Sequence, residues 1–211
     1  MGISLDTLLP FGDGSGTIAA DKSGHGNNAT LQGGAAWATD SIRTAVSLNG
    51  SSAYVSLPDD IVKTTGDFTI SAWVYWNGGQ TWARIFDFGS SFNRYIFLTP
   101  SSNTGKLRFA TSLSQGWTQS VLEGPSALPS RTWVHVAVTQ SGSTATLYGN
   151  GAAVASNSAM LFPPFQIGHT TQNWVGRSQY PHDPYFSGKI ADFRIYRGQL
   201  PSNQIAALAA G

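Results

Sequence analysis

Aromatic and polar side chains occur together in four stretches of the sequence that lack a clear strand pattern: 77–84, 91–95, 115–119 and 172–185. Aromatic rings with a polar tip combine an apolar face with a hydrogen-bonding group. Such rings can stack on the apolar C–H patches of a sugar while amides and guanidinium groups bind its hydroxyls. Together with the nearby Trp76, the candidate ligand-binding residues are Trp76, Trp82, Arg84, Asn93, Tyr95, Trp117, Asn173, Trp174, Arg177, Tyr180, His182 and Tyr185.

The stretch 172–185 is long for a simple connection between strands, and long ordered loops are often functional. Two interpretations of it stay open. It forms part of a binding site, or it is a lid in which Trp174 is buried and Arg177 bridges carbonyl groups. The chain has few charges, which suits a ligand rich in hydroxyls. A uronic acid would require Arg84, Arg94 and Arg177 to converge on its carboxylate.

A second kind of chemistry is suggested by residues 21–28. Ca²⁺ binds six to eight oxygen atoms, from carboxylates, amides and backbone carbonyls. This stretch offers the side chains of Asp21, Ser23, Asn27 and Asn28, and its two glycines allow the backbone to turn carbonyls inward. The spacing is not that of an EF-hand, and the alternative is an ordinary Asx turn.

Catalytic carboxylate pairs are not evident. Glu123 is the only glutamate in the chain, and Asp59 and Asp60 are adjacent, so on a strand they would point to opposite faces. Asp87 and Asp183 are isolated in the sequence. No Gly-x-Ser-x-Gly nucleophile elbow occurs either. The sequence therefore gives little support to an enzyme, whether hydrolase or lyase.

The elements that must position these side chains are predicted to be strands. Short stretches rich in β-branched and aromatic residues recur between turns with Gly and Ser, and two of them, 133–138 and 189–196, carry bulky residues on both faces. Asn49-Gly50 between two such stretches predicts a hairpin. Only 201–210 indicates a helix. The pattern predicts an all-β, two-sheet antiparallel sandwich with a short C-terminal helix.

Composition narrows the possible functions. The 211 residues contain 12 Lys and Arg, 11 Asp and Glu and no cysteine, with a net charge of +1. This balance argues against nucleic-acid or anionic-membrane binding, and the missing cysteines exclude disulfides and thiol chemistry. There is no apolar run of membrane-spanning length and no signal-peptide pattern at the start. No change in composition divides the chain, so we expect one domain over 1–211.

Several motifs together resemble laminin-G-like modules of the concanavalin A-like lectin/glucanase superfamily, of the kind attached to bacterial carbohydrate-active enzymes. The similarity extends over nearly the whole chain, and its motifs occur in the expected order. They are Asp21-Lys22-Ser23-Gly24 with Gly26-Asn27-Asn28, Val46-Ser47-Leu48-Asn49-Gly50, Phe68 to Val74, Trp133 to Val138, Leu147 to Gly151, Phe186 to Tyr196, and Leu200-Pro201-Ser202.

The resemblance implies a jelly roll, a secreted protein and often one structural calcium ion. It implies that Asp192, on the last strand, supplies a second carboxylate to the ion held by the loop of Asp21, while the turn at Asn49 could add a carbonyl. Removal of calcium would then lower the melting temperature. In the alternative, Asp192 pairs with Arg194 or with backbone amides.

The resemblance also implies the function that we expect, a non-catalytic carbohydrate-binding module. Its partner would be an oligo- or polysaccharide, with glycans that contain arabinose or galactose suggested by the glycosidase-linked members it resembles, and its parent protein would carry a catalytic domain. The alternatives are a protein-interaction or spacer module of the same fold, and, with least support, a polysaccharide hydrolase or lyase.

Overall fold

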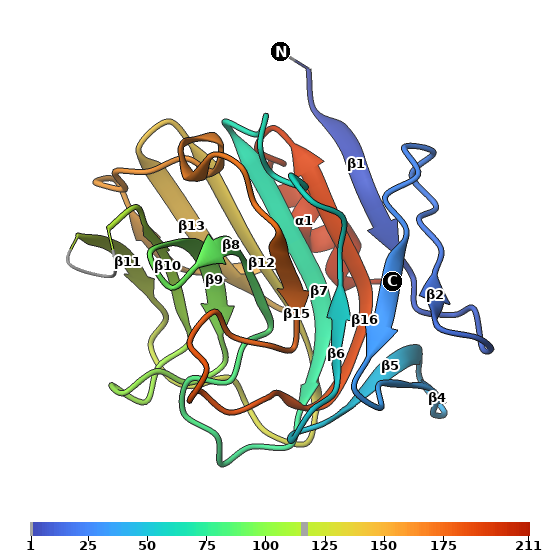
Figure 1. Cartoon of the computed structure of the whole chain (residues 1–211). Helices are drawn as coiled ribbons and strands as arrows, with labels where there is room; N and C mark the ends of the chain where they lie inside the picture. Colours follow the sequence, from blue (N-terminus) through green and yellow to red (C-terminus); the bar gives the residue numbers. More distant parts are fainter. Residues whose placement is uncertain (1, 115–117) are drawn as a thin grey trace.

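The computed structural model describes residues 2–114 and 118–211 and shows two antiparallel sheets packed face to face (Figure 1). The first, sheet A, consists of seven strands in one continuous order and an eighth strand, β1, which pairs with part of β16. That order is β14 (Ala152–Asn157), β13 (Thr144–Gly149), β12 (Trp133–Ser141), β7 (Phe68–Trp76), β16 (Ser187–Arg197), β5 (Thr44–Asn49) and β4 (Ala36–Thr39), and β1 spans Ser4–Leu9.

Sheet B lies in front of sheet A in Figure 1 and has its own order of eight strands. These are β11 (Gln119–Glu123), β10 (Arg108–Ser112), β9 (Arg94–Thr99), β8 (Phe86–Ser91), β15 (Gln172–Val175), β6 (Tyr54–Ser56), β3 (Ala29–Gln32) and β2 (Ile18–Ala19). Two helical segments complete the described chain, the 3₁₀ turn η1 (Pro164–Ile167) and α1 (Ser202–Ala209). The predicted all-β sandwich with a C-terminal helix is confirmed.

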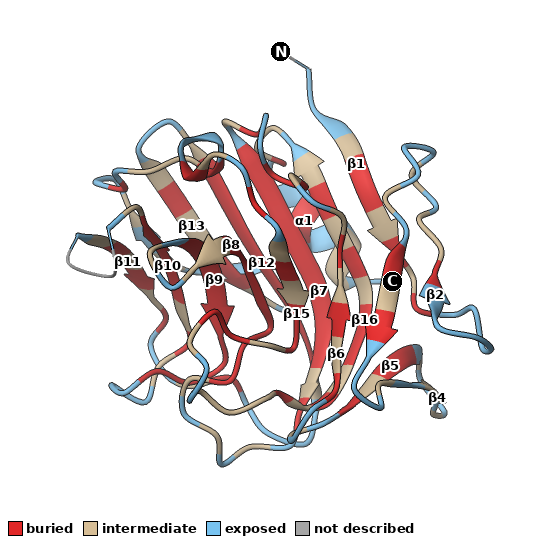
Figure 2. Ribbon diagram, in the orientation of Figure 1, coloured by how far each residue is buried: buried red, intermediate tan, exposed pale blue. Residues whose placement is uncertain are grey.

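The core fills the space between the sheets, where Figure 2 shows the strands buried along much of their length. Side chains alternate between the two faces of a strand, so one parity of β7 faces the core. Ile70, Val74 and Trp76 have that parity and belong to the core. Trp76 is only 5% exposed, and the prediction that it binds a ligand is therefore wrong.

The chain crosses from sheet A to sheet B at Asn49-Gly50. β5 pairs with β4 and β16, whereas β6 pairs with β3 and β15, so the two strands that flank this turn are not partners. The predicted hairpin is therefore wrong. The Asn49 side chain stabilises the turn locally, because its Oδ1 accepts hydrogen bonds from the backbone N–H groups of Ser51, Ser52 and Ala53.

A bulge interrupts β16 at Asp192, whose φ is 48°. Before the bulge the strand pairs with β5, and after it with β1, so the bulge marks the point where the edge partner changes. Bulges redirect side chains in this way. Here the bulge places the Asp192 carboxylate against the Arg194 guanidinium.

The outer faces of the two sheets are covered differently. α1 packs on sheet A through Ile205, together with Tyr148 and Ala137. On sheet B the connection 176–186 folds back over β8 and β9, with Tyr180 in contact with Tyr95. Among the residues that the structure describes, no helix has both the length and the apolar character to cross a membrane.

Candidate functional site

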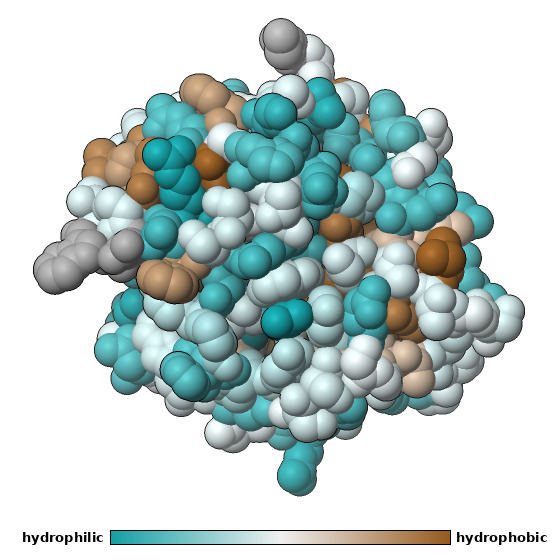
Figure 3. All heavy atoms as spheres, in the orientation of Figure 1, coloured by the Kyte–Doolittle hydropathy of each residue, from teal (hydrophilic) through white to brown (hydrophobic). Residues whose placement is uncertain are grey.

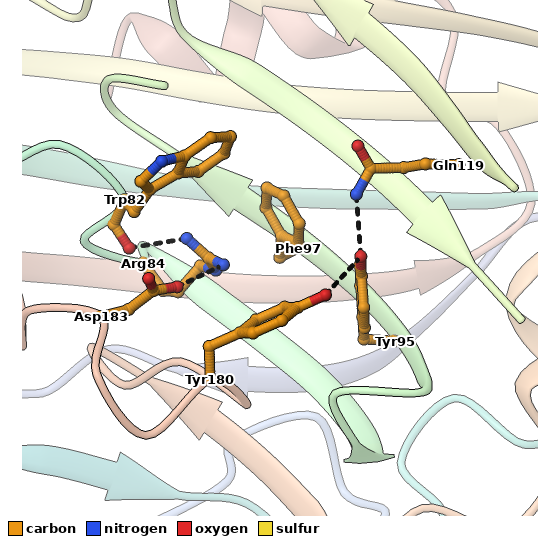
Figure 4. Close-up of a pocket in the computed structure, with 7 residues that line it drawn as sticks. All are labelled: Trp82, Arg84, Tyr95, Phe97, Gln119, Tyr180 and Asp183. Carbon is orange, nitrogen blue, oxygen red and sulfur yellow. Dashed lines mark hydrogen bonds and ion pairs between the residues drawn. The ribbon is translucent and has the colours of Figure 1, made fainter. Parts of the chain in front are cut away.

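A hollow of about 240 Å³ lies on the outer face of sheet B, at the end of the connection 176–186 (Figure 4). Strands β9 and β11, the residues before β8 and the connection 176–186 all contribute to it. Its lining residues are Trp82, Arg84, Tyr95, Phe97, Gln119, Tyr180 and Asp183.

Aromatic rings form a continuous row across this face. Phe92 contacts Tyr180 at 5.9 Å between ring centroids, Tyr180 contacts Tyr95 at 5.8 Å, Tyr95 contacts Phe97 at 5.5 Å, and Phe97 contacts Trp82 at 6.3 Å. Tyr95 and Phe97 have the outward parity of β9, whereas Ile96 and Leu98 belong to the core. Phe92 is exposed and Tyr180 and Trp82 are partly exposed, whereas Tyr95 and Phe97 between them are buried, so the row reaches the surface at Phe92, Tyr180 and Trp82.

Trp82 has an unusual backbone conformation, with φ at 70°. A bulky residue in this left-handed region is strained, and such strain often occurs at functional sites. Its N–H donates to the Ser101 carbonyl at 2.8 Å, and its carbonyl accepts from Arg84 Nη1 at 2.6 Å. These two bonds hold the indole at the rim of the hollow.

Arg84 connects the strand to the covering connection. Its side chain is 2% exposed, its Nε donates to Asp87 at 3.1 Å, and its Nη2 donates to Asp183 at 2.9 Å. The guanidinium carbon lies 4.0 Å from the centroid of the Phe97 ring. A buried guanidinium with two carboxylates and an aromatic face is fully engaged in the protein's own structure.

Asp87 lies beneath the hollow and is fully buried. Its Oδ2 accepts hydrogen bonds from Arg84 and from the backbone N–H of Gln179, while its Oδ1 accepts none from any residue that the structure describes. Burial raises the pKa of the Asp87 carboxyl to about 7. A raised pKa is also a property of general acids in glycosidases, but Asp87 is fully buried and is not among the residues that line the hollow. The carboxylates Asp87 and Asp183 are a structural pair around Arg84.

The opposite side of the hollow is polar. Gln119 Nε2 donates to Tyr95 Oη at 2.8 Å, and the hydroxyls of Tyr95 and Tyr180 are 3.2 Å apart. Burial raises the pKa of the Tyr95 phenol, which keeps it protonated. No described residue hydrogen-bonds to Gln119 Oε1, Asp183 Oδ1 or Trp82 Nε1. The lining therefore offers two free acceptors and one free donor to a ligand.

Four of the predicted ligand-binding residues meet in this hollow, namely Trp82, Arg84, Tyr95 and Tyr180. Gln119 and Asp183 lie in the predicted stretches 115–119 and 172–185 but were not among the twelve named candidates, and Phe97 lies outside these stretches. Phe97 could have been found from its spacing of two residues from Tyr95, which places both rings on one face of a strand. The contact of Asp183 with Arg84 joins residues 99 positions apart and has no local signal.

Trp174, Arg177 and Tyr185 form a separate cluster over β15 and β6. The Arg177 guanidinium lies 4.1 Å from the centroid of Trp174, 4.8 Å from that of Tyr54 and 5.8 Å from that of Tyr185. It covers these rings, an arrangement close to the predicted lid, although it bridges no carbonyl group that the structure describes. His182 is exposed on the same connection, outside the lining of the hollow.

Two amides among the predicted residues lie outside the lining of the hollow. Asn173 is fully buried on the core side of β15, and its Nδ2 donates to the carbonyls of Pro58 and Thr170. The prediction that it binds a ligand is wrong, because its parity on the strand is that of Val175. Asn93 lies in the β8–β9 turn and its backbone N–H donates to Ser91. Trp117 falls outside the described residues.

The loop of Asp21 is closed by its own hydrogen bonds. Asp21 Oδ1 accepts from the N–H groups of Leu8 and Ser23, and Oδ2 accepts from the Ser23 hydroxyl and the Asn27 N–H. Asn28 Oδ1 accepts from the Asp21 N–H. Although burial raises the pKa of Asp21, these hydrogen bonds outweigh it and leave the pKa below its ordinary value.

The other two predicted calcium ligands are engaged elsewhere. Both oxygens of Asp192 accept from Arg194, the alternative that the sequence left open, and Asn49 Oδ1 serves its own turn. Among residues 2–114 and 118–211, no three acidic, His or Cys side chains gather as a metal site. The six predicted ligands, Asp21, Ser23, Asn27, Asn28, Asn49 and Asp192, thus do not fit a calcium cage in this arrangement, and calcium stays a prediction of the resemblance.

A larger hollow of about 830 Å³ lies near the start of β1, and none of the described residues that line it is aromatic. Figure 3 shows that the face in view is mostly polar or weakly polar, with its apolar residues in scattered groups. The aromatic hollow over β9 therefore has the better chemistry for a sugar, because it combines ring faces with free polar atoms.

A family model described as "Concanavalin A-like lectin/glucanases superfamily" matches residues 49–206. The chain belongs to this superfamily. The match begins after the loop of Asp21, so the part of the calcium prediction that rests on this loop lies outside it. Among curated proteins, no sequence matches this member of the superfamily.

Several solved structures have a similar fold. Domain 4 of AbnA, an extracellular GH43 arabinanase from Geobacillus stearothermophilus in complex with arabinotriose, is 24% identical, with a TM-score of 0.84 over 99% of this chain and 100% of that one. A Ruminococcus gnavus sialidase CBM40 bound to sialyllactose has 17% identity and a TM-score of 0.67, with 78% and 96% coverage. The binding domain of botulinum neurotoxin serotype D/C has 16% identity and a TM-score of 0.74, and the chain spans 52% of it.

At these identities the similarity establishes the fold.

Proposed function

We propose that the chain is a carbohydrate-binding module and that the hollow between Trp82 and Tyr180 holds the sugar. The observation that carries this proposal is the hollow on the outer face of sheet B, where Trp82 and Tyr180 are partly exposed beside the buried rings of Tyr95 and Phe97. Next to these rings lie polar atoms to which no described residue hydrogen-bonds. The ring faces suit the C–H patches of a sugar, and Trp82 Nε1 and Gln119 Oε1 suit its hydroxyls.

The size of the hollow limits what it holds. At about 240 Å³ it is smaller than the roughly 300–1,000 Å³ of pockets for drug-sized ligands. We propose that it takes one sugar unit of an oligo- or polysaccharide and that the rest of the glycan extends over the surface.

The biological setting is also a proposal. The full-length similarity to a domain of an extracellular arabinanase supports an accessory module of a secreted glycosidase, with a glycan that contains arabinose as the first to test. A structural calcium remains a separate prediction, and sugar binding as proposed here does not depend on it.

Isothermal titration of the folded chain with arabinotriose, together with a panel of neutral oligosaccharides, tests the proposal. We expect binding that Trp82→Ala weakens by at least tenfold. Phe165→Ala is the matched control, since Phe165 is an exposed aromatic residue outside the hollow, and it should leave binding unchanged. Failure of every glycan to bind would overturn the proposal and favour a spacer or protein-interaction module.

A further inference from the structure

The charges around the hollow are all paired within the protein. Arg84 donates to Asp87 and Asp183, and Arg108, whose guanidinium lies 5.1 Å from the Trp82 ring centroid, binds Glu123 at 2.8 Å. Two positive and three negative side chains thus face one another here. Among the described residues, the hollow is left with no unpaired cation.

The three arginines that an acidic sugar would need are kept apart. Arg84 is buried under the rings, and Arg177 lies on Trp174 and Tyr54. Arg94 is exposed in the β8–β9 turn. Of the three, only Arg84 lines the hollow.

The free atoms of the hollow are mainly acceptors. Asp183 Oδ2 receives hydrogen bonds from Arg84 and from the Ser178 hydroxyl, but no described residue donates to its Oδ1, and the side chain is 20% exposed. The free Gln119 Oε1 adds a second acceptor. Hydroxyl groups can donate to these oxygens, whereas a carboxylate can only accept and would meet a like charge at Asp183.

We infer that the hollow selects uncharged sugars and excludes sugars that carry a carboxylate, such as uronic and sialic acids. This inference rests on the proposed sugar-binding function and defines its ligand class. Like charges at an interface weaken binding strongly, so a carboxylate in place of a hydroxymethyl group should lower affinity by about tenfold or more.

Matched ligands test this selectivity on the wild-type chain. Arabinotriose and galactotriose are compared with trigalacturonic acid and 3′-sialyllactose by titration at pH 8 and low salt. Each titration is repeated with Trp82→Ala, and only the part of the affinity that this variant removes is assigned to the hollow. We expect neutral glycans to bind there and acidic glycans to bind at least tenfold more weakly.

Two other outcomes are separable. Acidic glycans that bind the hollow as tightly as neutral ones would overturn the selectivity while sugar binding stands. No binding of any of the four would overturn both proposals.

Asp183→Asn tests the same selectivity within the site. The substitution removes the negative charge but keeps Oδ1, so it should narrow the preference for neutral glycans. An unchanged preference would contradict the role of Asp183.

Discussion

Asp183 Oδ2 lies 2.9 Å from Nη2 of Arg84, and this ion pair holds the connection 176–186 against the start of β8. The same guanidinium binds the buried Asp87 through Nε. One arginine therefore links a strand, the carboxylate beneath the hollow and the segment that closes it.

Replacement of Arg84 by methionine should destabilise the protein strongly. The substitution leaves Asp87 without its cation in a fully buried position, and loss of one partner of a buried pair costs about 3–5 kcal/mol. Urea unfolding at pH 8 measures the free energy of unfolding. The double variant Arg84→Met/Asp87→Leu should recover part of the loss, and equal stability of wild type and Arg84→Met would contradict the clamp.

Asp87 should make the protein more stable as the pH falls from 7 towards 4. Burial raises its pKa to about 7 from an ordinary value of 3.8, so between these values the folded state binds a proton that the unfolded state lacks. The stabilisation is complete below 3.8 and is lost as the pH rises through 7. Thermal melts of Asp87→Asn across this range should lack this component, and an unaltered pH profile would refute the assignment.

His135 should act in the opposite direction in the same range. It is buried beside Trp73 with Nδ1 unpartnered, and burial lowers its pKa to about 4. The unfolded chain takes up the proton near 6.5, so stability falls as the pH drops from 6.5 to 4. In His135→Met the loss of stability between pH 6.5 and 4 should disappear. The dependence of stability on pH in Asp87→Asn serves as the comparison. A variant that still loses as much stability as wild type would show that other groups cause it.

Trp82→Gly should separate stability from binding. Both Trp82→Ala and Trp82→Gly remove the ring that we assign to the sugar, and either should reduce affinity at least tenfold. Glycine tolerates the φ of 70°, whereas alanine keeps the strain, so Trp82→Gly should be the more stable by about 1 kcal/mol. Differential scanning calorimetry and glycan titration of both variants test this, and the reverse order of stability would argue against backbone strain.

Trp174→Ala should mainly affect stability. Arg177 lies over its ring, and Tyr54 contacts it edge-on at 5.9 Å, so the substitution removes packing rather than an open sugar platform. We expect a loss of roughly 1–3 kcal/mol in the free energy of unfolding, below the range for a fully buried tryptophan. A smaller loss of affinity than with Trp82→Ala is also expected. Abolished binding in a stable Trp174→Ala would instead place the cluster of Tyr54, Trp174, Arg177 and Tyr185 in the site.

Calcium can be tested by chelation. The calcium implied by the resemblance predicts that excess EDTA lowers the melting temperature. The pairing of Asp192 with Arg194 and the donors to both oxygens of Asp21 predict that it stays unchanged. A fall of several degrees that CaCl₂ reverses would confirm the calcium implied by the resemblance. It would also mean that the Asp192–Arg194 pair opens to admit the ion.

The sandwich could be predicted because alternation and turn residues are local signals that act within each strand. The wrong prediction that Trp76 binds a ligand was avoidable, because Ile70, Ala72 and Val74 lie on the same face of the strand and all belong to the core. The Asn49-Gly50 turn shows a true limit. A tight turn fixes the chain reversal, but whether the next strand pairs with the last one or crosses to the other sheet depends on distant strands.

The site was only partly predictable for the same reason. Trp82 and Tyr180 stood out because aromatic residues in polar loops are unusual, whereas Phe97 resembled an ordinary core residue of a strand with apolar side chains on both faces. The partnership of Arg84 and Asp183 arises from the path of the connection 176–186, which no local pattern encodes.

β1 and α1, which carry the two ends of the chain, both belong to the layer of sheet A, whereas the aromatic hollow opens on the outer face of sheet B. A tag, a sensor-chip linkage or a fused reporter attached at either end would therefore sit behind the sandwich. The protein can be immobilised through its termini with its glycan-facing side directed into solution.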